Sequence, residues 1–121
     1  MIFSFISALF SCRTDSPVII PTPALPAVVY FHKDIVPIFH SNCALAGCHN
    51  GSNVNIRLNL QDTVAYNQLF LHHEIDTITP IQSFLYQQMT SGATPMPPSG
   101  KLSDYDIALV LKWITQKAKN N

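Results

Sequence analysis

Three residues that lie close together in the sequence could do chemistry as a group: Cys43, Cys48 and His49. A cysteine thiol can form a thioether, a disulfide or a metal bond, and a neutral imidazole is the commonest metal ligand in proteins. Four residues separate the two cysteines, and the histidine follows the second one directly. The segment 43–49 is therefore a candidate for holding a prosthetic group or a metal ion.

A cysteine pair followed directly by a histidine is typical of covalent haem attachment. In that arrangement the two thiols form thioethers with the haem vinyl groups, and the histidine binds the iron as its proximal ligand. The usual spacing leaves two residues between the cysteines, so the longer segment 44–47 must bulge outward here. Gly47, just before Cys48, is suited to the unusual backbone angle that such a bulge needs.

A second iron ligand is expected in a proline-rich loop. Met96 stands between Pro95 and the pair 97–98, and fixed proline φ angles reduce the entropy lost when its sulfur is presented to iron. A distal methionine raises the reduction potential relative to a second histidine. His72 or His73 could replace it in a bis-histidine site, and this alternative stays open.

Four further residues are predicted to lie near the haem. Leu58 and Leu60 are expected to line its face, Arg57 to pair with a propionate, and Tyr86 to donate a hydrogen bond to a propionate. Ordinary roles are open for two of them, because Arg57 could be a solvated loop charge and Tyr86 an amphipathic core residue.

Other interpretations of the same residues also stay open. In an oxidising compartment Cys43 and Cys48 could form a disulfide, which would leave a cofactor-free lipoprotein interaction module. In a variant of this, zinc would be held by Cys43, Cys48, His49 and one of His72 or His73. If Met96 does not bind iron, a five-coordinate haem would suit ligand sensing or a redox subunit.

The N-terminal residues indicate export and lipid attachment. Residues 1–11 form an apolar run that suits a signal peptide, and Leu9 to Cys12 resembles the lipobox of bacterial lipoproteins. That resemblance implies cleavage before Cys12 and lipidation of its thiol, which would anchor the protein to a membrane in the cell envelope, on its periplasmic or outer-surface side. The alternative is an ordinary buried N-terminal segment.

Composition limits the remaining possibilities. The chain has 121 residues, enough for one small domain, with 12% charged residues and a formal net charge of zero. No basic patch suggests nucleic acid as a partner. Residues 12–28 are rich in proline and are predicted to form an extended tether of about 45 Å, although the same segment could instead wrap the domain.

From residue 29 onward the pattern predicts an all-α domain of three to five short helices. One helix begins near Asp34 and leads into Cys43, and a second runs from an N-cap at Asp62 to about Phe70. A third begins at Pro80, with its apolar residues stacked at 81, 85 and 89. So few residues in short helices bury little apolar surface, and a haem would give them a body to pack on.

The last helix has the clearest signals. Ser103 and Asp106 resemble a capping box, and an apolar stripe follows at Ile107, Val110, Leu111 and Ile114.

Taken together, residues 30–118 resemble a small bacterial class I cytochrome c of the lipoprotein-associated kind. The matching marks, in chain order, are Cys43-x4-Cys48-His49, Leu58-Asn59-Leu60, Tyr66, Ser83-Phe84-Leu85-Tyr86, Met96-Pro97-Pro98, Leu102-Ser103 and Trp113-Ile114. The resemblance implies one covalent haem c per chain, ligated by His49 and Met96, with Trp113 packed on the first helix. It also implies an electron carrier that meets redox protein partners rather than an enzyme.

Overall fold

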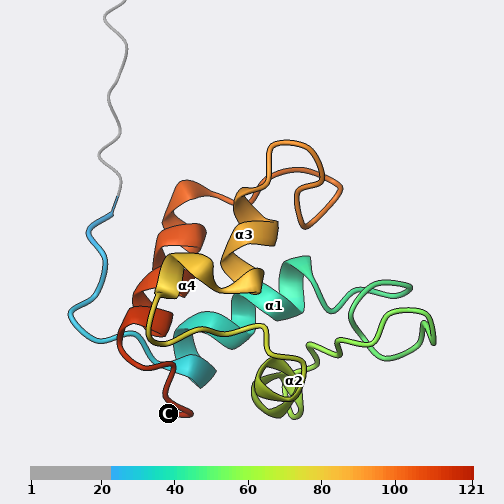
Figure 1. The fold of residues 1–121 in the computed structure, drawn as a ribbon, viewed down its shortest axis with the longest axis horizontal. Helices are drawn as coiled ribbons and strands as arrows, with labels where there is room; N and C mark the ends of the chain where they lie inside the picture. The colour runs from blue at the N-terminus through green and yellow to red at the C-terminus, as the bar shows by residue number, and fades with distance from the viewer. Residues whose placement is uncertain (1–22) are drawn as a thin grey trace, which may run out of the picture.

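The computed structural model describes residues 23–121, which contain four α-helices and two shorter helical turns joined by loops (Figure 1). No strand occurs within these residues, so the predicted all-α class is confirmed. The elements are η1 (Phe31–Ile35), α1 (Val36–Asn42), α2 (Ala65–Leu71), η2 (Pro80–Gln82), α3 (Phe84–Thr90) and α4 (Asp104–Thr115). The predicted signal peptide and the lipid-bearing Cys12 lie outside the described residues. None of the helices within 23–121 is long and apolar enough to cross a membrane.

The core is centred on Trp113 in α4, whose side chain is fully buried. Its ring lies 5.0 Å from that of Phe31 in η1 and 6.4 Å from that of Tyr66 in α2, measured between ring centroids. The indole Nε1 donates a hydrogen bond to the Lys119 carbonyl at 2.9 Å, so its polar atom is satisfied. Trp113 therefore packs where η1 runs into α1 and fixes α4 against the first helical segment.

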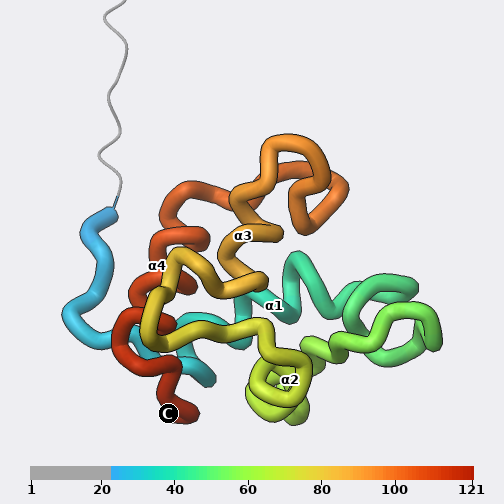
Figure 2. Tube along the Cα trace, in the orientation of Figure 1, coloured from blue at the N-terminus to red at the C-terminus, as the bar shows by residue number. Residues whose placement is uncertain are grey.

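The two ends of the described chain are tied together beside α4. The Gln116 side chain accepts a hydrogen bond from Val29 N and donates one to the Ala27 carbonyl, while Asn121 accepts bonds from Phe31 and His32. Figure 2 shows the N-terminal segment and the C-terminus next to one another. Leu25 packs against the core as well. Residues 25–28, at the end of the predicted tether, thus lie against the domain.

The first helical segment begins earlier than predicted, at Phe31. The Asp34 carboxylate accepts a hydrogen bond from Tyr30 N at 2.7 Å, and Asp34 N donates to the Tyr30 carbonyl. These bonds close a turn ahead of the expected start. Pro37 is tolerated because it falls in the first turn of α1, where its missing N–H is not needed.

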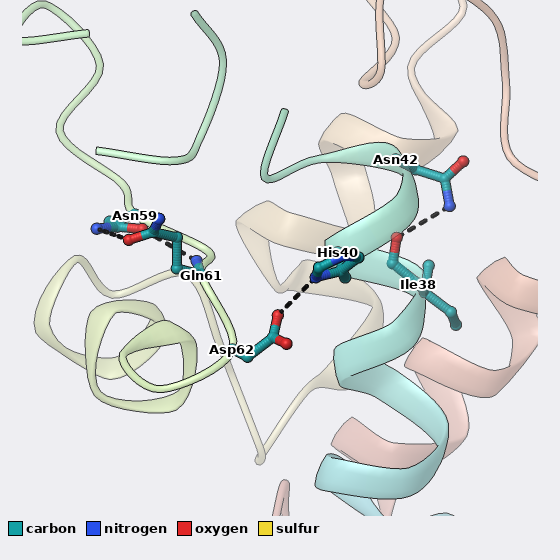
Figure 3. Close-up of polar contacts among 6 residues, drawn as sticks. All are labelled: Ile38, His40, Asn42, Asn59, Gln61 and Asp62. Atoms are coloured by element: carbon teal, nitrogen blue, oxygen red, sulfur yellow. Dashed lines mark hydrogen bonds and ion pairs between the residues drawn. The ribbon is translucent and has the colours of Figure 1, made fainter. Parts of the chain in front are cut away.

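The prediction that Asp62 caps the second helix is wrong. The helix α2 begins only at Ala65, after a turn in which Val64 N and Ala65 N both donate to the Gln61 carbonyl. The Asp62 carboxylate instead lies 3.1 Å from Nδ1 of His40 on α1 (Figure 3). A side chain that has a partner on another helix is no longer available to the helix start.

The helix predicted from Pro80 is interrupted at Ser83. This buried serine accepts a hydrogen bond from Asp76 N at 2.8 Å through Oγ and adopts an extended backbone, so η2 ends and α3 begins after it. Leu85 and Met89 are buried as the stacking pattern predicted, whereas Ile81 is 56% exposed.

The predicted cap of the last helix is present. Ser103 Oγ accepts a hydrogen bond from Asp106 N at 3.0 Å and donates one to the Asp106 carboxylate at 2.7 Å. The stripe below it turns inward: Ile107, Val110 and Ile114 are buried. Capping and burial together explain why α4 is the longest helix in the described part of the chain.

Candidate functional site

A cavity of about 410 Å³ lies between the end of α1, the loop that follows it, α3 and the proline-rich loop 91–100. Figure 1 shows the two loops on the same side of the molecule. The walls are predominantly apolar, and the volume falls in the range of small-molecule and cofactor sites. The lining residues are Asn42, Cys43, Gly47, Cys48, His49, Ile56, Arg57, Leu58, Leu60, Glu74, Phe84, Leu85, Gln88, Met89, Met96, Pro97 and Pro98.

Cys43 is placed by the C-terminus of α1. Its N–H donates to the Phe39 carbonyl at 2.8 Å, and because Phe39 is buried in the core, the helix end is fixed and the cysteine with it. Both Cys43 and Cys48 are free thiols and half-buried. Burial, with a smaller contribution from Cys48, raises the pKa of Cys43 to about 11. The Cys43 thiol is thus protonated at neutral pH.

This protonation predicts slow alkylation of Cys43 in protein made without haem. At pH 8 the thiolate share is on the order of 90-fold lower than for a thiol with the ordinary pKa of 9.0, and the greater nucleophilicity of the more basic thiolate offsets about tenfold of this. Iodoacetamide should therefore modify Cys43 about tenfold more slowly in the folded protein than in urea, as followed by peptide mass spectrometry. Equal rates in the two states would contradict the burial of this thiol. Modification that needs prior reduction would indicate the disulfide instead.

His49 is held on three sides. Its backbone N–H donates to the Cys43 carbonyl at 3.0 Å, its carbonyl accepts from Leu60 N at 2.7 Å, and its ring Nδ1 lies 3.0 Å from the Leu58 carbonyl. Because a carbonyl can only accept, Nδ1 must carry the hydrogen in this contact. In the neutral ring Nε2 then keeps its lone pair, which is the state that a metal-binding imidazole requires.

Met96 reaches the cavity from the proline-rich loop. Its backbone N–H donates to the Gln88 carbonyl in α3 at 3.0 Å, which fastens the loop to the last turn of that helix. The Met96 side chain lines the cavity and is 38% exposed in total. Met89, in contrast, is buried within α3, as predicted, and contributes to the cavity wall.

Three of the four predicted pocket residues line this cavity, namely Arg57, Leu58 and Leu60. Leu60 is buried and Leu58 half-buried, while Arg57 is exposed, so a positive charge stands at an open part of the wall. Tyr86 does not line the cavity; it is half-buried and packs against the core. This position is compatible with the alternative of an amphipathic core residue.

His72 and His73 both lie outside the cavity lining. His72 Nε2 contacts the Gln68 side chain at 3.2 Å, and His73 is exposed with a left-handed φ of 57° at the end of α2. No group of three or more His, Cys, Asp or Glu side chains that could hold a metal ion occurs within residues 23–121. The zinc alternative is accordingly not assembled in this part of the chain.

Three polar residues of the cavity wall were not predicted: Asn42, Glu74 and Gln88. Burial raises the pKa of the Glu74 carboxyl above its usual range. Glu74 follows His73 in a polar stretch that is typical of a solvated helix end, so no sequence pattern predicted that Glu74 would line the cavity. It reaches the cavity because its backbone pairs with two elements: its N–H donates to Leu69 and its carbonyl accepts from Leu85.

Comparisons with models of protein families, with curated proteins and with solved structures found no match for this chain. The functional argument therefore depends on the residues of the cavity and their geometry.

Proposed function

We propose that this protein is a lipid-anchored, monohaem c-type cytochrome that transfers single electrons between redox partners. The observation that carries the proposal is the convergence of Cys43, Cys48, His49 and Met96 on one predominantly apolar cavity. Met96 is 47 residues after His49 in the sequence, so their meeting is a property of the fold and adds to the motif itself.

The donor set fits a covalently held haem. Each thiol would add across one vinyl group, its sulfur bonding to one carbon and its hydrogen going to the other, so that nothing is oxidised and no group leaves. His49, with Nδ1 engaged by the Leu58 carbonyl, has Nε2 free for iron, and Met96 supplies a soft thioether. Arg57 is available to a propionate at the exposed part of the wall.

Electron transfer is favoured over catalysis by this set of ligands. A bound haem would supply iron that alternates between two oxidation states, and if His49 and Met96 both held that iron, no position would be open for a substrate. Electron carriers meet their partners through small and short-lived interfaces. Since the formal net charge of the chain is zero, we expect those encounters to depend weakly on ionic strength.

Attachment to a membrane is proposed from Cys12 and the apolar residues before it. Diacylation and further acylation of one cysteine would hold the protein at the cell envelope, on the periplasmic or outer-surface side. The proline-rich segment that follows would set the distance of the haem domain from the bilayer.

The test is a haem stain and a visible spectrum of the denatured chain after expression with a c-type maturation system. We expect haem to stay with the polypeptide under denaturation, and a Cys43→Ser/Cys48→Ser double variant to lose it. The lipidated Cys12 remains in that variant and serves as an internal control for export. A colourless wild-type chain would overturn the proposal and leave the lipoprotein interaction module.

A further inference from the structure

Gly47 is the residue that turns the chain into Cys48. Its φ is +77°, a left-handed conformation that side chains other than glycine rarely adopt. A Cβ at this position would meet no atom within 4 Å, so space does not require the glycine; the backbone conformation does. The turn continues with Cys48 N donating to the Leu45 carbonyl at 2.9 Å.

Both peptide groups of Gly47 are bonded by side chains from beyond His49. Ser52 Oγ accepts a hydrogen bond from Gly47 N at 3.3 Å, and Asn53 Nδ2 donates one to the Gly47 carbonyl at 3.2 Å. Ser52 is in turn oriented by Asn50, whose Oδ1 accepts from Ser52 Oγ at 2.6 Å and from Ser52 N at 3.0 Å. The segment between the cysteines is thus fastened at its last residue by the loop that follows.

Cys43 needs no such support, because the end of α1 already places it. Cys48 follows four intervening residues, so the turn at Gly47 positions it on its N-terminal side, while the bonds of His49 hold the chain on its C-terminal side. A one-ångström misplacement of a reacting group can cost about a hundredfold in rate. The second thiol therefore depends on the conformation of Gly47 far more than the first.

We infer that Ser52 and Asn53 are positioning residues that hold Gly47, and through it Cys48, so that a four-residue spacing still delivers both thiols to one haem. The inference rests on the proposed function and deepens it. It assigns a role to residues outside the cysteine-histidine segment, in a loop whose polar composition alone suggests only a solvated connection.

The experiment compares the full chain with a Ser52→Ala/Asn53→Ala variant, both made with a c-type maturation system. The haem-bearing protein is denatured and treated with iodoacetamide, and each label is located by mass spectrometry. We expect the wild type to take up no label at Cys43 or Cys48. The double variant should carry label at Cys48, and not at Cys43, in a measurable share of its haem-bearing chains. Its reduced pyridine–haem spectrum should shift to longer wavelength, because an unreacted vinyl group extends the conjugation.

Matched variants separate positioning from general damage to the loop. Asn55→Ala removes an exposed asparagine side chain from the same loop and should behave as wild type. The single variant Ser52→Thr keeps the hydroxyl that binds Gly47 N and should carry both thioethers, as the wild type does. Gly47→Ala strains the turn without touching either side chain and should also leave Cys48 free. Gly92→Ala, at an equally open glycine without a left-handed φ, should not.

The outcomes are distinguishable. A double variant and a Gly47→Ala variant that both carry two thioethers at the wild-type level would overturn the inference while leaving the cytochrome proposal intact. If the double variant does not accumulate, the inference is tested by comparing Gly47→Ala with Gly92→Ala. Equal labelling of Cys48 in these two variants would overturn it. Wild-type protein without covalent haem would overturn the proposed function itself.

Discussion

Replacing Met96 by leucine is expected to lower the reduction potential by on the order of a hundred millivolts or more and to open the iron to external ligands. A thioether stabilises ferrous iron, and leucine keeps the size of the side chain without a donor atom. The haem should remain attached, because Cys43, Cys48 and His49 are unchanged. Potentiometric titration and carbon monoxide binding to the reduced protein measure the two effects.

Met89→Leu is the matched control for this experiment. Met89 and Met96 both line the cavity, and both substitutions remove one sulfur from its wall. Only the loop methionine is proposed as a ligand, so the Met89→Leu variant should keep the wild-type potential and remain closed to carbon monoxide. If the wild type binds carbon monoxide readily and Met96→Leu changes nothing, the iron is five-coordinate, and a sensing or redox-subunit function replaces that of a carrier.

The main residues of the candidate site could be predicted because they are marked locally in the sequence. Cys43, Cys48 and His49 form a contiguous motif, and the prolines around Met96 mark a stiff loop. Their lining of one cavity could not be derived from these marks, since it depends on how α3 holds the loop through the Gln88 carbonyl. Glu74 reaches the cavity wall through backbone pairing with residues 69 and 85, and no local pattern encodes such pairing.

For the fold, the presence of the helices could be predicted from the sequence, but several of their boundaries could not. Helix existence followed from apolar spacing, and the start of α4 from the Ser103 cap. Helix boundaries failed wherever a side chain found a partner outside its own segment. Asp62 looks like a cap in sequence but contacts His40 on α1, and Ser83 ends η2 by bonding to Asp76. Both partners are seven or more residues away, beyond the reach of a capping rule.

Trp113→Ala is expected to reduce the free energy of unfolding by about 3–5 kcal/mol, a large share of the 5–15 kcal/mol typical of a whole domain. The indole is fully buried against Phe31 and Tyr66, and its removal would leave a cavity where α4 meets η1. Urea unfolding followed by circular dichroism measures the change. Ile78→Ala, at a side chain that is 90% exposed, should stay within about 0.5 kcal/mol of wild type.

The same substitution should also reduce covalent haem per chain, because η1 leads directly into α1 and α1 positions Cys43. The free energy of unfolding and the amount of covalent haem should therefore change together. The larger the unfolded fraction of the Trp113→Ala variant at the expression temperature, the less haem it should carry. Growth at lower temperature should restore attachment in proportion to the folded fraction. Full haem loading in a Trp113→Ala variant that is largely unfolded would show that the maturation system reads the cysteine-histidine segment alone, and that the fold matters only after attachment.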